Sequence, residues 1–113
     1  MPYIRIRTNK KVEEDKVEEI KRKLGEDISI LGKSESWLMV DIDDEARNLY
    51  FRGSKDDIAY VEIKLFGRAD ASHYNIMTEN ITSSITNNLN IDPDKVYVSY
   101  FETSNWGWNG KNF

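Results

Sequence analysis

The order of strand-like and helix-like segments is the same in both halves of this 113-residue chain, and it restricts the fold more than any other feature. In each half, a segment with strand-like alternation is followed by an amphipathic helical pattern and then by a second strand-like segment. A helix that joins two neighbouring strands favours parallel pairing with a right-handed crossover. We therefore predict a single domain, residues 1–113, built from two βαβ units at residues 1–43 and 57–102.

The strands of these units are predicted at residues 2–8, 37–42, 58–66 and 96–101. The helices are predicted from apolar residues at steps of three and four, which are Val17, Ile20, Leu24, Ile28 and Leu31 in the first helix and Tyr74, Met77, Ile81, Ile85 and Leu89 in the second. Gly32 is the expected end of the first helix, which Gly25 weakens. Asp70 or Ser72 is placed to cap the second helix, and Pro93 fixes the turn after it.

Two such units predict an α/β (α+β) fold, a four-stranded mixed sheet with both helices on one face. The other face of the sheet would be bare, and its residues include apolar and aromatic side chains. Because soluble monomers rarely expose a large contiguous apolar face, we expect other copies of the chain to cover it.

The composition excludes several classes of function. The chain has no cysteine, which removes disulfides, thiol nucleophiles and thiolate metal sites, and its one histidine, His73, argues against a zinc site. The net charge is −4 and no basic stripe is present, which argues against a nucleic-acid partner. No apolar run is long enough to span a membrane, and the first residues lack the apolar core of a signal peptide. We expect a cytoplasmic protein; secretion without a standard signal is left open.

The first residues, Met1-Pro2, have a special chemical possibility. A small second residue allows the initiator methionine to be removed, which would leave Pro2 with a free secondary amine. An N-terminal amine titrates near neutral pH, and burial lowers its pKa further, so it can act as a base. The alternative interpretation is that Pro2 simply opens an edge strand. The N-terminus alone favours the edge-strand interpretation.

The last ten residues, 104–113, place Trp106 and Trp108 on either side of Gly107. Two exposed tryptophans would be costly in a free terminus. The segment therefore predicts either a short strand that adds to the sheet edge of a neighbour or the wall of an apolar pocket.

Several local motifs resemble the macrophage migration inhibitory factor and D-dopachrome tautomerase family of the tautomerase superfamily. The motifs that carry this resemblance are Met1-Pro2, Thr8-Asn9, Gly32-Lys33, Gly53-Ser54, the segment 91–100 (IDPDKVYVSY), the segment 105–109 (NWGWN) and Phe113. The resemblance extends over the whole chain and is most specific in the C-terminal segment together with Pro2.

The resemblance implies a homotrimer whose sheets form a central barrel, with sites at the subunit boundaries. It implies that Pro2 is the catalytic base and that Lys33 pairs with a carboxylate or carbonyl oxygen of the substrate. By itself, Lys33 has the alternative interpretation of an ordinary surface lysine after a helix end. No cofactor and no metal are implied.

The remaining site residues also follow from the resemblance. Phe66 would contribute a backbone contact, Tyr97 would reach the pocket from the neighbouring subunit, and Trp106 and Trp108 would line it. Phe66 and Tyr97 have the alternative interpretation of core residues. Ser99 stands where better-known members have a longer asparagine, so its contact with substrate would run through water, and Trp106 stands where a valine is common, which narrows the pocket. The family's CxxC motif has no counterpart here, so the associated thiol activity is not expected.

Two functions of different classes follow. The first is a cofactor-free keto–enol tautomerase of small aromatic α-keto acids such as phenylpyruvate, with Pro2 as the base. The alternative is a cytokine-like signalling ligand for a cell-surface receptor, with a secondary or vestigial pocket. The sequence does not separate them, because one surface could serve both.

Overall fold

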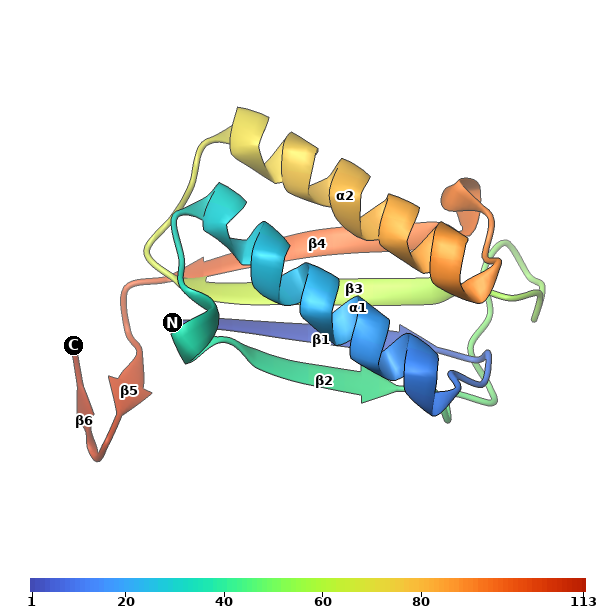
Figure 1. Cartoon of the computed structure of the whole chain (residues 1–113), viewed down its shortest axis with the longest axis horizontal. Helices are drawn as coiled ribbons and strands as arrows, with labels where there is room; N and C mark the ends of the chain where they lie inside the picture. Colours follow the sequence, from blue (N-terminus) through green and yellow to red (C-terminus); the bar gives the residue numbers. More distant parts are fainter.

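A four-stranded mixed sheet forms the base of the computed structural model, which describes residues 1–113 (Figure 1). Its strands are β1 (Pro2–Thr8), β2 (Met39–Asp43), β3 (Ala59–Phe66) and β4 (Val96–Thr103), in the order β2-β1-β3-β4. Strand β1 pairs in parallel with β2, and β3 pairs in parallel with β4, whereas β1 and β3 are antiparallel. The two parallel βαβ units predicted from the sequence are confirmed, and the central antiparallel pair joins them into one sheet.

Both helices cover the same face of this sheet (Figure 1). Helix α1 (Glu14–Asp27) continues into a short 3₁₀ turn, η1 (Ile28–Leu31), and ends at Gly32, whose φ of 72° is left-handed. Glycine adopts this conformation without steric cost, which confirms its expected role as the terminator. Helix α2 (Ala71–Leu89) begins after Asp70, but the Asp70 side chain makes no capping hydrogen bond.

The core lies between the helices and alternate residues of the central strands. Ile4 and Ile6 of β1 and Ile63 and Leu65 of β3 are completely buried. They meet the apolar stripes of the helices, because residues two apart on a strand face the same side. The core therefore combines the period of two in the strands with the period of about 3.6 in the helices.

The helix-free face of the sheet differs from the expectation of an apolar and aromatic surface. On β1 and β2 it is mixed, because Arg5 forms ion pairs with Asp41 at 3.3 Å and with Asp43 at 3.0 Å, whereas Tyr3 and its exposed register partner Met39 are aromatic and apolar. On β4 it is aromatic, with Tyr97 and Phe101 exposed. The expectation is correct for β4 and holds in part for β1 and β2, where ion pairs interrupt the apolar and aromatic side chains.

Strand β2 begins two residues later than predicted, because residues 35–37 form a short 3₁₀ helix, η2 (Glu35–Trp37). The Ser34 hydroxyl caps this turn by accepting a hydrogen bond from the Ser36 N–H at 3.2 Å. Local side-chain capping competes successfully with the strand propensity of Trp37. As a result, Trp37 belongs to a turn rather than to the sheet.

The tail folds on itself as a hairpin of two short strands, β5 (Gly107–Trp108) and β6 (Lys111–Asn112). Asn109 and Gly110 connect them with φ values of 54° and 85°, the positive φ pair that favours tight hairpins. The hairpin lies beyond the end of the main sheet, near the N-terminus of the chain (Figure 1). Within one chain it therefore extends no edge of the four-stranded sheet.

The close approach of Glu35 to Gly25 leads to a prediction about the free energy of unfolding. Gly25 is buried in α1, and a Cβ at this position would lie 1.9 Å from Glu35 Oε2. Alanine in place of glycine inside a helix gains about 1 kcal/mol, but here the Glu35 carboxylate must first move. We expect Gly25→Ala to raise the free energy of unfolding more in a Glu35→Ala background than in the unaltered chain. Urea denaturation of the four proteins measures this coupling, and equal gains in both backgrounds would contradict the contact.

Candidate functional site

Three of the residues predicted for the site meet where β1 begins and β3 ends. Pro2 is buried and pairs with Leu65 in the β1–β3 register. Lys33 follows the left-handed Gly32, and its Nζ donates a hydrogen bond to the Phe66 carbonyl oxygen at 2.8 Å. The Phe66 N–H donates to the Met1 carbonyl oxygen at 3.1 Å. Hydrogen bonds therefore link the N-terminus, Lys33 and the end of β3.

A series of aromatic rings extends from this point into the tail. The centroids of Phe66 and Phe113 are 5.5 Å apart, and Phe113 lies parallel to Trp108 at 6.5 Å. Trp108 in turn meets the edge of Trp37 at 5.0 Å. The Phe113 N–H donates to the Trp106 carbonyl oxygen at 3.0 Å, which closes the hairpin. The tail thus packs its aromatic rings against Phe66 and Trp37 as an aromatic wall, and the pocket that these rings would line stays a prediction.

Trp37 and Phe113 were not predicted as site residues. Trp37 was predicted to lie in a strand. Only its position four residues after Lys33 could have suggested that it belongs to the site. Phe113 carried part of the resemblance but had no assigned contact. Trp106 is half-buried and supplies a backbone carbonyl to the hairpin, whereas Trp108 takes part in the ring series.

The electrostatic environment of the N-terminus favours a neutral amine. Partial burial lowers the pKa of the Met1 amine below its usual value, and the positive charge of Lys33 lowers that pKa further. Both effects disfavour the protonated form. A neutral amine beside a lysine can accept a proton while the lysine holds an anion.

Tyr97 and Ser99 do not join these residues within one chain. They pair with Tyr60 and Glu62 of β3, whereas the Pro2 neighbour Leu65 lies five residues beyond Tyr60 along that strand. This offset corresponds to roughly 17 Å along the sheet for Tyr97. The Ser99 hydroxyl lies 2.6 Å from the Tyr60 hydroxyl, which gives it a partner within its own chain.

An apolar cavity of about 290 Å³ lies beside Tyr97 at that opposite end of the sheet. It is lined by Leu49, Tyr50, Phe51, Ile58, Tyr60, Lys95 and Tyr97. Tyr97 packs edge-on against Phe51 with ring centroids 4.8 Å apart, yet 61% of its surface stays exposed. The only charged group in the lining is Lys95, whose Nζ is bound to Asp56 at 3.0 Å.

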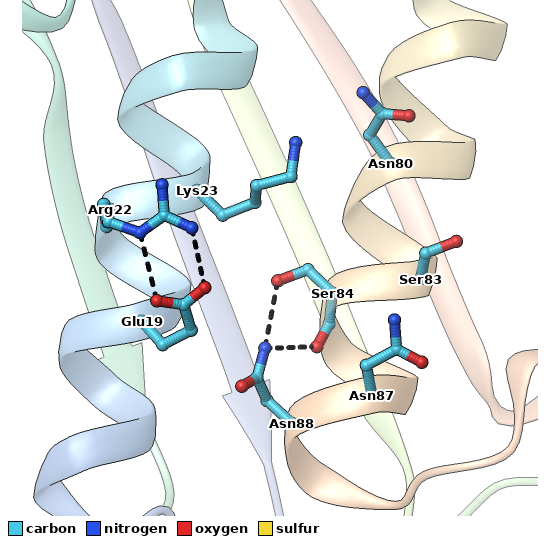
Figure 2. A pocket seen from close by; sticks show the side chains of 8 residues that line it. All are labelled: Glu19, Arg22, Lys23, Asn80, Ser83, Ser84, Asn87 and Asn88. Carbon is cyan, nitrogen blue, oxygen red and sulfur yellow. Dashed lines mark hydrogen bonds and ion pairs between the residues drawn. The ribbon is translucent and has the colours of Figure 1, made fainter.

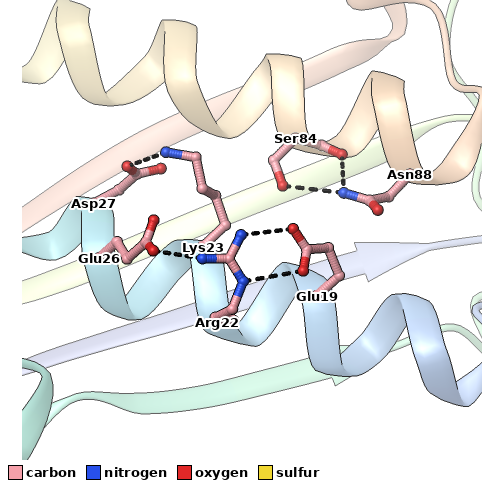
Figure 3. A network of polar contacts seen from close by, with 7 residues as sticks. All are labelled: Glu19, Arg22, Lys23, Glu26, Asp27, Ser84 and Asn88. Carbon is pink, nitrogen blue, oxygen red and sulfur yellow. Dashed lines mark hydrogen bonds and ion pairs between the residues drawn. The ribbon is translucent and has the colours of Figure 1, made fainter.

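A second cavity of about 290 Å³ lies between the two helices and is lined only by polar residues (Figure 2). Its two cations are already paired along α1, because Arg22 contacts Glu19 and Glu26, and Lys23 contacts Asp27 at 2.7 Å (Figure 3). Asn80 of α2 also donates to Asp27, at 3.3 Å. The Asn80–Asp27 contact ties the helices together, and no hydrophobic side chain lines the groove.

Metal and membrane sites receive no support from the geometry. No group of three or more His, Cys, Asp or Glu side chains comes together in a way that could hold a metal ion. Neither helix combines the length and the apolar character needed to cross a membrane.

The whole chain is similar to one family of known proteins. A family model described as macrophage migration inhibitory factor (MIF) matches residues 1–113. The crystal structure of Leishmania major MIF2 is 30% identical with a TM-score of 0.92, over 100% of this chain and 97% of that chain. The macrophage migration inhibitory factor homologue from Prochlorococcus marinus is 28% identical with a TM-score of 0.83, over 98% of each chain. The Toxoplasma gondii factor, at 17% identity and a TM-score of 0.90 over 98% and 99%, shows the shared fold alone. No curated protein sequence matches.

Proposed function

Because this chain belongs to the macrophage migration inhibitory factor family, we propose that it is a cofactor-free keto–enol tautomerase of small aromatic α-keto acids such as phenylpyruvate. Pro2 is the base in this proposal, after removal of Met1. The observation that carries it is the meeting of Pro2, Lys33 and Phe66 at the start of an aromatic wall. Turnover of phenylpyruvate by Met1-free protein, followed by the absorbance of the enol, tests the proposal, and its absence refutes it.

The position of the terminal amine after removal of Met1 supports Pro2 as the base. Removal of Met1 moves the terminal amine from a half-buried residue to the buried Pro2. Burial and the charge of Lys33 already lower the pKa of the Met1 amine, and we expect the same two causes to act on Pro2. A lowered pKa favours the neutral amine, which is the form that takes a proton.

Lys33 and the aromatic wall would bind the substrate. The Lys33 ammonium has three N–H groups and gives one to Phe66, so the others can bind the substrate carboxylate. The Phe66 and Phe113 rings, tilted by 34° to each other, would offer an aromatic surface for the substrate ring. Trp106 and Trp108 would form the tail side of this pocket, as expected from the resemblance.

The proposed reaction moves one proton and no net charge. The Pro2 nitrogen takes a proton from the carbon between the ring and the carbonyl group of phenylpyruvate. The electron pair of that C–H bond forms the carbon–carbon double bond, and the carbonyl electrons move to the oxygen. The protonated Pro2 nitrogen then gives this proton to the oxygen, which forms the enol and restores the neutral amine, and the reverse steps return the keto form. Lys33 offsets the charge of the carboxylate during these steps.

The pH dependence provides a direct test of the base. A lowered amine pKa means that activity is present above that pKa and is lost as the pH falls through it. We expect the nitrogen of labelled Pro2 to titrate below the range of an exposed prolyl amine in NMR spectra, at the midpoint of the acid limb of the rate profile. We also expect Lys33→Met to raise this midpoint. A midpoint typical of a free amine would mean that the site does not tune Pro2.

The substrate contacts that the family resemblance implies for Tyr97 and Ser99 require a second copy of the chain. Tyr97 lies roughly 17 Å along the sheet from Pro2 in its own chain, and Ser99 already has a partner in Tyr60. Exposed Tyr97 on β4, together with exposed Trp108 and Phe113 in the tail, supports association through these surfaces. The proposed assembly is a homotrimer with Tyr97 of one copy near Pro2 of the next.

The state of assembly tests this part of the proposal. We expect light scattering at micromolar concentration to give about three times the 13.2 kDa mass of one chain. Tyr97→Glu should shift the mass towards the monomer, because it places a charge among apolar side chains, whereas Lys11→Glu, in an exposed loop, should not. A stable monomer in the unaltered protein would refute both the trimer and the shared site.

A further inference from the structure

The polar groove between α1 and α2, with a volume of about 290 Å³, takes no part in the proposed tautomerase site (Figure 2). It lies on the side of the helices, opposite the sheet face that exposes Tyr97 and Phe101, so association through those side chains leaves it open. We propose that this groove binds a neutral polyhydroxylated ligand, of which a disaccharide is the chemical class that fits best. This inference goes beyond the proposed function and does not depend on it.

The charged groups at the groove are already paired within the chain, so they favour neither an anion nor a cation. Arg22 contacts Glu19 at 2.7 Å and also contacts Glu26, and Lys23 contacts Asp27 at 2.7 Å (Figure 3). The carboxylates outnumber the cations in these contacts, which works against an anionic ligand. A cationic ligand would have to compete with Arg22 and Lys23 for the same carboxylates.

Two asparagines of α2 offer hydrogen-bond acceptors to the groove, because the chain itself holds their amide nitrogens. The Asn80 nitrogen donates to Asp27 at 3.3 Å, and the Asn88 nitrogen donates to the Ser84 carbonyl oxygen at 2.8 Å. The side-chain oxygens of Asn80 and Asn88 accept no hydrogen bond from the chain, and both residues line the groove. They are roughly 12 Å apart along the helix axis, a length that two linked sugar rings can span.

Lys23, Ser83 and Asn87 add hydrogen-bond donors to the same groove. The Lys23 ammonium gives one of its three N–H groups to Asp27, so the others are free to bind a ligand. The exposed side chains of Ser83 and Asn87 form no hydrogen bond within the chain, and each can both donate and accept. The groove therefore presents donors and acceptors side by side.

Hydroxyl groups match such a mixture, because each hydroxyl donates one hydrogen bond and accepts others. An anion would use only the donors, and an ammonium group would use only the acceptors. A further cavity of about 440 Å³ shares Ser83 and Asn87 with the groove, and the only charged residue of its lining is Glu79. The uncharged polar surface thus extends along α2 beyond the groove itself.

The composition of the lining also limits the expected affinity. Hydrogen bonds to a sugar replace hydrogen bonds to water, so each of them adds little net free energy. No hydrophobic side chain lines the groove to add the burial of apolar surface. We therefore expect dissociation constants on the order of 1 mM.

NMR titration of nitrogen-labelled protein tests the inference, because the side-chain amide of each asparagine gives its own signals. The probes are maltose, diacetylchitobiose, inorganic phosphate and putrescine. We expect one of the disaccharides or both to cause saturable shifts of the Asn87 side-chain signals and of the backbone signals of residues 83–88, and phosphate and putrescine to cause none. Tighter binding of diacetylchitobiose would indicate the glycan of a glycoprotein as the source of the ligand, and tighter binding of maltose would indicate a free saccharide.

The double variant Ser83→Ala/Asn87→Ala locates the binding. It removes two side chains that have no partner within the chain, so the fold should persist, whereas Lys23 and Asn80 hold the buried Asp27 and are left unaltered. We expect the affinity for the disaccharide to fall about tenfold. The matched control is Asn75→Ala, which changes an exposed asparagine of α2 outside the groove and should leave the affinity unchanged. Circular dichroism of all variants controls for helix content.

Each result decides for or against a saccharide site. Saturable shifts that the double variant weakens and Asn75→Ala does not weaken support it. The absence of saturable shifts with both disaccharides overturns it, and so does tighter binding of phosphate or putrescine. An equal loss of affinity in Asn75→Ala and in the double variant also overturns it, because binding would then not depend on the groove.

Discussion

Acetylation of Pro2 in the Met1-free protein is expected to reduce phenylpyruvate turnover to the uncatalysed rate while the fold persists. The amide nitrogen has no basic electron pair, and loss of a positioned general base costs about 100- to 10,000-fold in rate. The fold should persist because Pro2 already carries an acyl group, that of Met1, in the structure. Steady-state kinetics with phenylpyruvate measure the loss, and circular dichroism controls for the structure.

Two further forms sharpen this result. A form with glycine ahead of Pro2 should be as inactive as the acetylated protein, because both lack the amine. Pro2→Gly in the processed chain keeps a terminal amine, so it should retain more activity than either blocked form. Full activity in a preparation whose mass shows a residue before Pro2 would rule out the amine as the base.

Replacement of Lys33 is expected to have the second largest effect. Lys33→Met removes the positive charge that would meet the substrate carboxylate, and a hydrogen bond to a charged group contributes about 1.5–3 kcal/mol. This corresponds to a decrease in kcat/KM of roughly 10- to 150-fold. The side-chain length is nearly kept, so packing near Phe66 should change little. The control is Lys11→Met, which alters an exposed loop lysine and should leave kcat/KM unchanged.

A change of substrate separates the charge of Lys33 from its other effects. The methyl ester of phenylpyruvate has the ring and the keto group but no carboxylate. We expect Lys33→Met to decrease turnover of the ester much less than turnover of the acid. Equal losses for both substrates would show that Lys33 supports the Phe66 end of β3 rather than binding the carboxylate.

The elements of the fold followed from local patterns in the sequence. Alternation in residues 2–8 and the three- and four-residue spacing of Ile81, Ile85 and Leu89 were sufficient, because each pattern requires one apolar face to be buried. Gly32 marked the end of the first helical segment for a local reason too, since its backbone adopts a left-handed φ. The exception was Trp37, where the Ser34 cap favours a turn over a strand.

The arrangement of the site depended on pairing between distant parts of the chain. The sequence indicated Pro2 and Lys33 as residues of interest, but only the tertiary structure brings them to Phe66. The antiparallel β1–β3 register pairs Pro2 with Leu65, and the Lys33 side chain reaches the Phe66 carbonyl oxygen. The same holds for the ion pairs of Arg5 with the β2 aspartates, which depend on the parallel register of β1 and β2. Register is set by contacts across the whole sheet, which spacing along one strand does not contain.

Tyr97 shows most clearly what the sequence determined by itself and what the tertiary structure decided. Its place on a strand was evident from the alternation of residues 96–101, because strand-forming side chains need no distant partner to be recognised. Its position along the sheet was not, because the parallel pairing of β4 with β3 places it opposite Tyr60, near the start of β3, whereas Pro2 lies opposite Leu65, near the end. The sequence thus determined which segments form strands and helices. Only the tertiary structure decided that Pro2, Lys33 and Phe66 meet at one end of the sheet while Tyr97 lies towards the other.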